Sequence, residues 1–210
     1  MTTSETLSVA DIEAAGLPDW RWLLGALHAD FASGDFATGL ELVNRIGAMA
    51  EEANHHPDID LRYPHVRVTL VSHDASGVTS RDVDLARRIS AAASDVGASA
   101  VPARISLLEI GLDTADEEAI KPFWRAVLGL DEASAQDLDL LWFQHTDAHE
   151  APRQRFHLDV TVPPEVAQQR IRAAIAAGGT LVSDDQAPAF VVLADAEGNK
   201  ACICTSHGRD

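Results

Sequence analysis

Hydrophobic and polar positions alternate with two different periods in the first hundred residues. Apolar residues from Phe36 to Ala50 recur at helical spacing, which predicts a helix that begins at the N-cap Asp35 and ends before Pro57. Residues 66–72 instead alternate between apolar and polar side chains, as a half-buried strand does. The other predicted elements are a hairpin over 20–31, a strand over 59–63, a helix that starts at 80 and a short helix near the start. The order ββαββα predicts an antiparallel sheet with helices on one face.

The second half contains a weak internal repeat. Its predicted elements are strands at 104–112 and 138–144 around a helix at 117–128, then a strand at 156–162, a helix at 165–177, and strands at 180–183, 190–194 and 200–204, with a tight turn at 197–199. The repeat predicts paired βαβββ modules. A segment of small residues with a proline, 98–104, reads as a linker. We therefore expect an α+β chain with two domains, residues 1–100 and 104–210.

The net charge of the chain limits the classes of molecule that it is expected to bind. Asp and Glu number 33 against 16 Lys and Arg, which gives a formal net charge of −17. Such a surface repels phosphate backbones and anionic lipids, so neither nucleic acid nor a membrane is expected as a partner. The N-terminus lacks the pattern of a signal peptide, and the expected location is the cytoplasm. The two cysteines, Cys202 and Cys204, are too close along one strand for a good disulfide and are expected to be reduced.

The densest group of chemically active side chains lies in the first half: Glu51, His55, His56, Tyr63, His73 and Asp82. Three imidazoles that titrate near neutrality offer both acid and base groups. We expect them to converge, because His55 and His56 follow a helix and His73 ends a strand that can lie beside it. Glu51 precedes His55 by one helical turn, so its carboxylate is expected to orient an imidazole.

Structural explanations compete with this chemical one. Adjacent histidines at the end of a helix also complement the helix dipole. Asp82 also fits as the acidic member of a capping box that Thr79 begins, and Tyr63 also fits as an aromatic residue of an edge strand. His55 and His56 point in different directions, so they suit a single zinc ion poorly.

The pattern Glu51-x3-His55-His56-Pro57-x5-Tyr63-x9-His73-x8-Asp82 resembles the signature of the pterin-4a-carbinolamine dehydratases. The resemblance covers most of residues 6–97. The chain departs from the family at Ser72, where threonine is usual, and at Asp58 and Ile59, where an aromatic residue is frequent. The resemblance implies dehydration of 4a-hydroxytetrahydropterin to quinonoid dihydropterin, which regenerates the cofactor of aromatic amino-acid hydroxylation.

The resemblance also implies roles for these residues. His56 and His73 would flank the leaving hydroxyl, and His55 would contact the pterin ring or share in the proton transfer. Glu51 would orient a histidine, and the remaining residues would shape or support the pocket: Pro57, Tyr63, Arg81 and Asp82. No metal or organic cofactor is required, because the pterin is the substrate. A homo-oligomer is expected.

The second half resembles the glyoxalase/bleomycin-resistance/dioxygenase superfamily, which has the vicinal-oxygen-chelate fold. The matching segments are 123–130, 156–160 and 193–199, within residues 104–206. Metal-using members place ligands on the first and last strands of each module, and Glu109 and His157 hold such positions. Cys202, however, stands where those enzymes usually have glutamate, and Gln144 or His145 is the nearest candidate for a further ligand. A Glu–His pair can also be purely structural, and we expect a metal-free accessory domain.

The sequence is compatible with three functions. The leading one is a dehydratase in the first half. The second is a metal-dependent lyase or dioxygenase activity in the second half, and the third is a non-catalytic regulator that binds a pterin or a protein.

Overall fold

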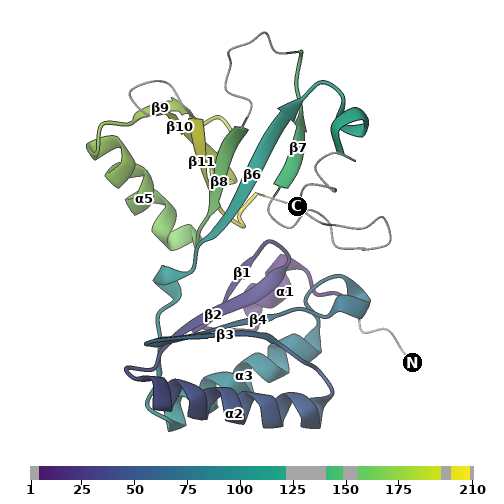
Figure 1. Ribbon diagram of the computed structural model, residues 1–210, viewed down its shortest axis with the longest axis vertical. Coiled ribbons are helices and arrows are strands. Elements are labelled where there is room, and N and C mark those ends of the chain that lie inside the picture. Colours follow the sequence, from purple (N-terminus) through teal and green to yellow (C-terminus); the bar gives the residue numbers. More distant parts are fainter. Residues whose placement is uncertain (1–4, 122–140, 149–155, 195–199, 209–210) are drawn as a thin grey trace. The chain divides into compact units, whose positions relative to one another are not determined.

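The chain folds as two units, Met1–Ile105 and Ser106–Asp210. The computed structural model describes residues 5–121, 141–148, 156–194 and 200–208. Within these residues, no helix has both the length and the apolar character needed to cross a lipid bilayer. Each unit consists of a sheet with helices (Figure 1).

The N-terminal unit is built on an antiparallel sheet with the strand order β1-β2-β4-β3. Its strands are β1 (Arg21–Leu23), β2 (Ala26–Ala32), β3 (Asp58–Arg62) and β4 (His65–Leu70), and β5 (Ser99–Ala100) adds to β2. The predicted hairpin is β1 and β2. Its turn residues Leu24 and Gly25 both have positive φ, 49° and 80°, as a type I′ turn requires.

Three helices contribute to this unit: α1 (Val9–Ala14), α2 (Phe36–Ala53) and α3 (Ser80–Asp95). In Figure 1, α2 and α3 lie on one face of the sheet. One core joins both layers, with Phe31 and Val68 from the strands and Leu42, Ile46 and Ile89 from the helices. Alternate strand residues point into this core, as the period of two predicts. The predicted antiparallel sheet with helices on one face is confirmed.

The helix ends follow local chemistry. Asp35 caps α2 as predicted, because its Oδ1 accepts from the Thr38 N–H at 2.7 Å. The other end differs from the prediction. The helix stops at Ala53 because Asn54 takes the left-handed conformation, with φ of 45°, and its N–H bonds back to carbonyl groups of the last turn. Pro57 therefore lies beyond the helix end and does not terminate it.

Two further segments differ from the sequence predictions. Strand β4 ends at Leu70, so His73 is not a strand residue; it begins a 3-10 turn, η1 (His73–Ala75). The segment predicted as a linker is partly built into the N-terminal sheet, because Ala100 pairs with Phe31 and a second 3-10 turn, η2 (Pro102–Arg104), follows. Neither difference changes the fold class.

The C-terminal unit is built on a six-stranded mixed sheet with the order β7-β6-β8-β11-β10-β9. Its elements are β6 (Leu107–Thr114), β7 (Leu141–His145), β8 (Phe156–Thr161), α5 (Pro164–Ala176), β9 (Thr180–Ser183), β10 (Phe190–Ala194) and β11 (Lys200–Cys204). The order β8-α5-β9-β10-β11 is one complete βαβββ module, consistent with the predicted glyoxalase-like architecture. The predicted helix beyond residue 121, the whole segment 123–130 and the turn 197–199 lie outside the described residues.

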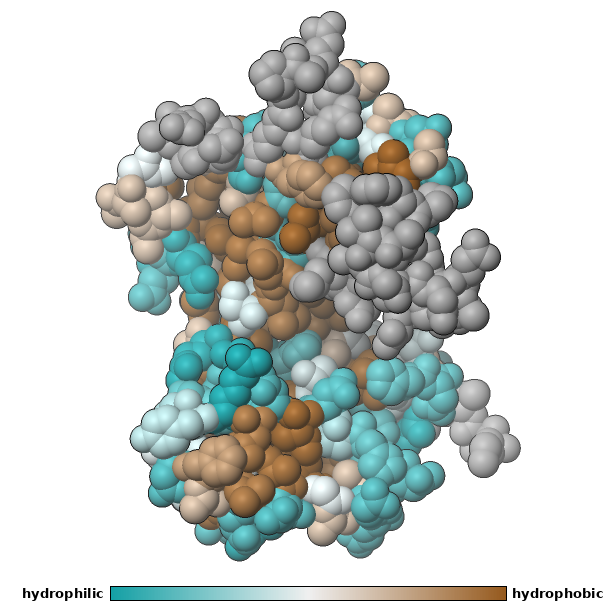
Figure 2. Space-filling view, viewed as in Figure 1, coloured by the Kyte–Doolittle hydropathy of each residue, from teal (hydrophilic) through white to brown (hydrophobic). Residues whose placement is uncertain are grey.

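Helix α5 covers one face of this sheet. Ile171 of the helix shares a core with Val191, Leu193 and Ile203 of the strands. Side chains alternate along a strand, so the neighbours of these apolar residues point to the opposite face. Hydrophobic residues also reach the visible surface of each unit (Figure 2).

Candidate active site

The pairing of β3 with β4 brings the two histidine segments of the motif to one end of the sheet. Asp58 pairs with Thr69, so the residues just before β3 and just after β4 lie at the same end. His55 and His56 are in the first group, and His73 is in the second. The expected convergence of these two segments therefore follows from the strand register.

Tyr63 lies at the other end. It follows β3, and a strand rises about 3.3 Å per residue, so the five residues of β3 place Tyr63 at the far edge of the sheet from His56. The Tyr63 side chain is 72% exposed. Pro57, by contrast, precedes β3 directly and lies at the histidine end. The sequence grouped Tyr63 with the histidines, and within this chain the structure separates them.

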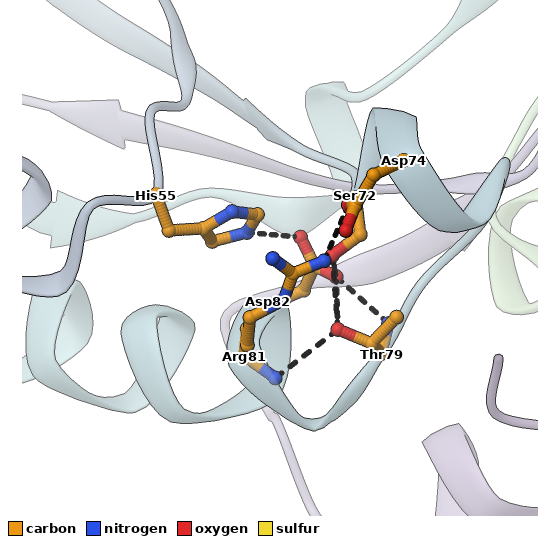
Figure 3. A network of polar contacts seen from close by, with 6 residues as sticks. All are labelled: His55, Ser72, Asp74, Thr79, Arg81 and Asp82. Carbon is orange, nitrogen blue, oxygen red and sulfur yellow. Dashed lines mark hydrogen bonds and ion pairs between the residues drawn. The ribbon is translucent and has the colours of Figure 1, made fainter. Parts of the chain in front are cut away.

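A buried hydrogen bond between the His55 ring and the Asp82 carboxylate forms the centre of the site (Figure 3). His55 Nε2 lies 2.7 Å from Asp82 Oδ1, and the side chains are only 8% and 0% exposed. The second oxygen, Oδ2, accepts from Ser72 Oγ at 2.7 Å, from the Thr79 N–H at 2.7 Å and from Thr79 Oγ1 at 3.2 Å. Both carboxylate oxygens are thus engaged, which offsets the cost of burying the charge.

Because both oxygens of the Asp82 carboxylate are already hydrogen-bonded, the carboxylate determines which ring nitrogen of His55 carries the proton. An ionised carboxylate only accepts hydrogen bonds, so the ring places its proton on Nε2 when it is neutral. Nδ1 then carries the lone pair and is the atom able to take up a proton. The same carboxylate completes the predicted capping box at the start of α3, which is confirmed. Asp82 therefore combines the structural role and the supporting role that the sequence offered as alternatives.

Arg81 and Asp74 link His73 to the start of α3. Arg81 Nη2 donates to Asp74 Oδ1 at 2.5 Å, and Asp74 directly follows His73 in η1. The hydrogen bond from the Arg81 guanidinium holds the pKa of Asp74 below its ordinary value. The Arg81 Nε atom is buried and has no hydrogen-bond partner among the described residues. Its N–H is thus a donor that remains available for a bound molecule.

Glu51 pairs with a different histidine from the expected one. Its Oε1 lies 3.0 Å from His56 Nε2, and both side chains are exposed. The helical spacing from Glu51 pointed to His55, but the left-handed Asn54 ends the helix between them. Residues four apart share a face only within a helix, so the Glu51 side chain does not lie beside His55. The chain instead turns His55 inward towards Asp82.

Three contributions to this site were not predicted from the sequence. Ser72 and Thr79 donate hydrogen bonds to Asp82, and Asp74 pairs with Arg81. The sequence marks Ser72 only as a departure from the family pattern. Thr79 carried a signal, because the first residue of a capping box holds its acidic partner by definition. Asp74 carried a weaker one, its position directly beside His73.

The face of the C-terminal sheet opposite α5 carries a second group of polar residues. Glu109 pairs across the strands with Asp159, and His157 pairs with Gly111. His157, Asp159 and Cys202 each offer a ligand atom, and these atoms all lie within 4.8 Å of one another. Gln144 and His145, named from the sequence as candidates for a further ligand, are exposed at the end of β7. Asp159 was missed, although its position two residues after His157 places both on one face.

Two protein families match the chain, one in each half. Residues 5–92 match the family model of pterin 4 alpha carbinolamine dehydratase, and residues 109–204 match that of a glyoxalase-like domain. Both resemblances found in the sequence are confirmed.

Curated relatives of the N-terminal half agree with this result. The provisionally named pterin-4-alpha-carbinolamine dehydratases of Thermosynechococcus vestitus and Nocardia farcinica are 44% and 43% identical over 89 residues, which is 41% of this chain and 94% of each relative. A crystal structure of a transcriptional coactivator/pterin dehydratase from Brucella melitensis is 30% identical, with a TM-score of 0.41 over 42% of this chain and 99% of that one. The chain thus belongs, through its N-terminal half, to the pterin-4-alpha-carbinolamine dehydratase family.

Proposed function

We propose that the N-terminal unit is a hydro-lyase that dehydrates 4a-hydroxytetrahydropterin to quinonoid dihydropterin and so recycles a pterin cofactor. One observation carries the proposal. His55 is held by a fully engaged, buried Asp82 at the end of the sheet where the exposed His56 and His73 also lie. Family membership supports the same activity.

The reaction needs groups that move protons and no change in oxidation state. The bond between C4a and the hydroxyl oxygen breaks, the oxygen leaves as water after it gains a proton, and a ring N–H gives up its proton. Imidazoles suit both transfers near neutral pH, and each positioned group contributes about 10²–10⁴-fold. No metal ion is needed in this unit for such a step.

In this proposal the exposure and hydrogen-bond partners of each histidine determine its role in the reaction. His56 and His73 are exposed and flank the leaving hydroxyl, where one is the acid and the other the base. Glu51 orients the ring of His56 through the contact at its Nε2. His55, with Nε2 held by Asp82, offers Nδ1 to the pterin ring. Arg81 supplies its buried Nε–H to a polar atom of the substrate.

The test is the decay rate of 4a-hydroxytetrahydropterin in the presence of the purified full chain. His56→Ala and His73→Ala are each expected to lower kcat by about 10²–10⁴-fold. His207→Ala is the matched control, because this exposed histidine lies in the other unit. The proposal fails if the wild-type chain does not accelerate the decay, or if the double variant His56→Ala/His73→Ala retains the full rate.

A further inference from the structure

The turn that carries His73 is a single round of 3-10 helix, η1. It is closed by a backbone hydrogen bond from the Ser76 N–H to the His73 carbonyl at 3.3 Å. Before His73 the turn is anchored in the core, because the buried Ser72 hydroxyl donates to Asp82. A 3-10 turn has poorer hydrogen-bond geometry than an α-helix. An exposed histidine on such a turn therefore keeps one position only if a second contact holds the turn.

Asp74 provides a second contact, on the other side of His73 (Figure 3). Its Oδ1 accepts a hydrogen bond from Arg81 Nη2 at 2.5 Å. Arg81 belongs to the first turn of α3. Asp74 thereby ties the His73 turn to the same helix start whose carboxylate, Asp82, holds His55.

Folding stability does not account for this contact. The side chains of Arg81 and Asp74 are 35% and 57% exposed, and water screens such ion pairs so strongly that they contribute little to folding. The hydrogen bond from Arg81 lowers the pKa of Asp74, and the charge of a protonated His55 lowers it further. Asp74 therefore stays ionised throughout the pH range in which imidazoles titrate, and the contact is intact wherever the histidines exchange protons.

The same arginine has one donor that no described residue accepts. Arg81 Nε is buried and lacks a hydrogen-bond partner in the described part of the chain. A buried N–H without an acceptor costs free energy, which a bound molecule with an acceptor atom recovers. The guanidinium is planar and rigid, so the hydrogen bond from its Nη2 to Asp74 also fixes the direction of the Nε–H.

We propose that Asp74 is a positioning residue of the active site, in a role that rests on the dehydratase activity proposed above. Acting through Arg81, it keeps His73 in place beside the leaving hydroxyl and directs the Arg81 Nε–H towards the substrate. A pterin ring offers suitable acceptors, namely a carbonyl oxygen and ring nitrogens that carry no proton. The two ends of the contact between Asp74 and Arg81 therefore predict two separate kinetic effects, one on kcat and one on KM.

Removal of the Asp74 carboxylate tests the first effect. Asp74→Ala is expected to lower kcat by about 10²-fold, because a displacement of a reacting group by about 1 Å has an effect of that size. Asp74→Asn keeps an oxygen acceptor of the same shape and is expected to retain most of kcat. The measured rate is the decay of 4a-hydroxytetrahydropterin in the presence of the full chain. An unchanged kcat in Asp74→Ala would overturn the proposal.

Arg81→Lys separates the second effect from the first. Lysine keeps a positive charge for Asp74, so His73 stays in place, but it has no counterpart of the Nε–H. We expect KM to rise by about 10-fold or more while kcat is retained, because a hydrogen bond from a charged donor is lost in the ground state and the transition state alike. An unchanged KM would refute the assignment of the Nε–H to the substrate.

A double-mutant cycle tests whether Asp74 acts through Arg81. In the Arg81→Ala background, Asp74→Ala is expected to cause no further loss of kcat, since the contact is already absent. Losses that multiply would show that Asp74 acts independently, contrary to the proposal. The matched control is Asp84→Asn, which removes an exposed ion pair with Arg87 on the same helix and is expected to leave kcat and KM unchanged.

Two further measurements do not depend on turnover. The NMR signals of the His73 ring are expected to shift in Asp74→Ala and to change little in Arg81→Lys, because only the first variant frees the turn. Each variant is expected to unfold at the same denaturant concentration as the wild type, since the ion pair is exposed. Unshifted His73 signals, or a loss of stability large enough to explain the lower rate, would exclude this role of Asp74. A wild-type chain without activity would instead reject the proposed function.

Discussion

Each unit of this protein buries an aspartate beside a histidine, and the two pairs differ in how completely the carboxylate is engaged. Asp82 has a partner for each oxygen, with His55 on Oδ1 and three donors on Oδ2. Asp159 leaves Oδ1 without a hydrogen-bond partner among the described residues.

The number of hydrogen bonds to the carboxylate gives the same pair of residue types different properties in the two units. A saturated carboxylate fixes the tautomer and position of its histidine, which favours proton transfer at the other ring nitrogen. A buried carboxylate with an open oxygen is costly by itself, because the oxygen has lost its hydration without gaining a hydrogen bond. The residue types alone do not distinguish these cases, because both pairs consist of one histidine and one aspartate.

The strongest test of this comparison is truncation of the saturated carboxylate. Asp82→Ala leaves His55, Ser72 and the Thr79 N–H without their acceptor in the core, so we expect it to lower the free energy of unfolding by about 3–5 kcal/mol. Denaturant unfolding measures the change. Asp84→Ala, two residues further along the same helix and exposed, is the control and is expected to change stability by less than about 0.5 kcal/mol. Similar values for the two variants would show that the network contributes little.

Two buried threonines sharpen the comparison. Thr79 Oγ1 bonds to Ser72 and Asp82, whereas Thr161 Oγ1 has no hydrogen-bond partner in the described part of the chain. Valine has nearly the same shape and lacks the hydroxyl. Thr79→Val is expected to destabilise by about 2 kcal/mol, because it removes a helix cap and a buried donor. Thr161→Val is expected to be neutral or to stabilise by up to about 1 kcal/mol. Equal losses in thermal or denaturant unfolding would contradict the distinction.

His28 is a further half-buried histidine, and both of its ring nitrogens have hydrogen-bond partners that are not carboxylates. Its Nε2 bonds to the Leu23 carbonyl at 3.1 Å, and its Nδ1 lies 3.2 Å from the Thr69 hydroxyl. Burial lowers the pKa of His28 below its ordinary value of 6.5, because the charged form loses its hydration.

The pH dependence follows from the sign of that shift. The unfolded chain binds a proton on His28 at a higher pH than the folded chain, so its contribution is fully present above pH 6.5 and is lost as the pH falls towards the folded pKa. The loss is at most about 1.4 kcal/mol per pH unit. His28→Gln removes this term, so we expect the wild-type chain to lose more stability than the variant between pH 7 and 5.5. Parallel curves of the unfolding free energy against pH would refute the assignment.

The two candidate sites also differ in how far the sequence predicted them. In the N-terminal unit, the spacing from Glu51 to Asp82 indicates His55, His56, His73 and Asp82 as a group. In the C-terminal unit, it named His157 but paired it with Glu109. The first site draws on short segments around one strand pair, whereas the second needs the register of β8 against β11, which are about forty residues apart along the chain.

The sequence by itself determined the two halves, most of the helices and strands, the caps at Asp35 and Thr79, and the group of histidines. These features depend on periodicity and on side chains within four residues of one another, which are local properties of a chain. Only the tertiary structure decided the partners: Asp82 for His55, Glu51 for His56, and Asp113 and Asp159 for His157. The physical reason is that a partner is set by where a helix ends and by how strands align, and both result from packing across the whole unit.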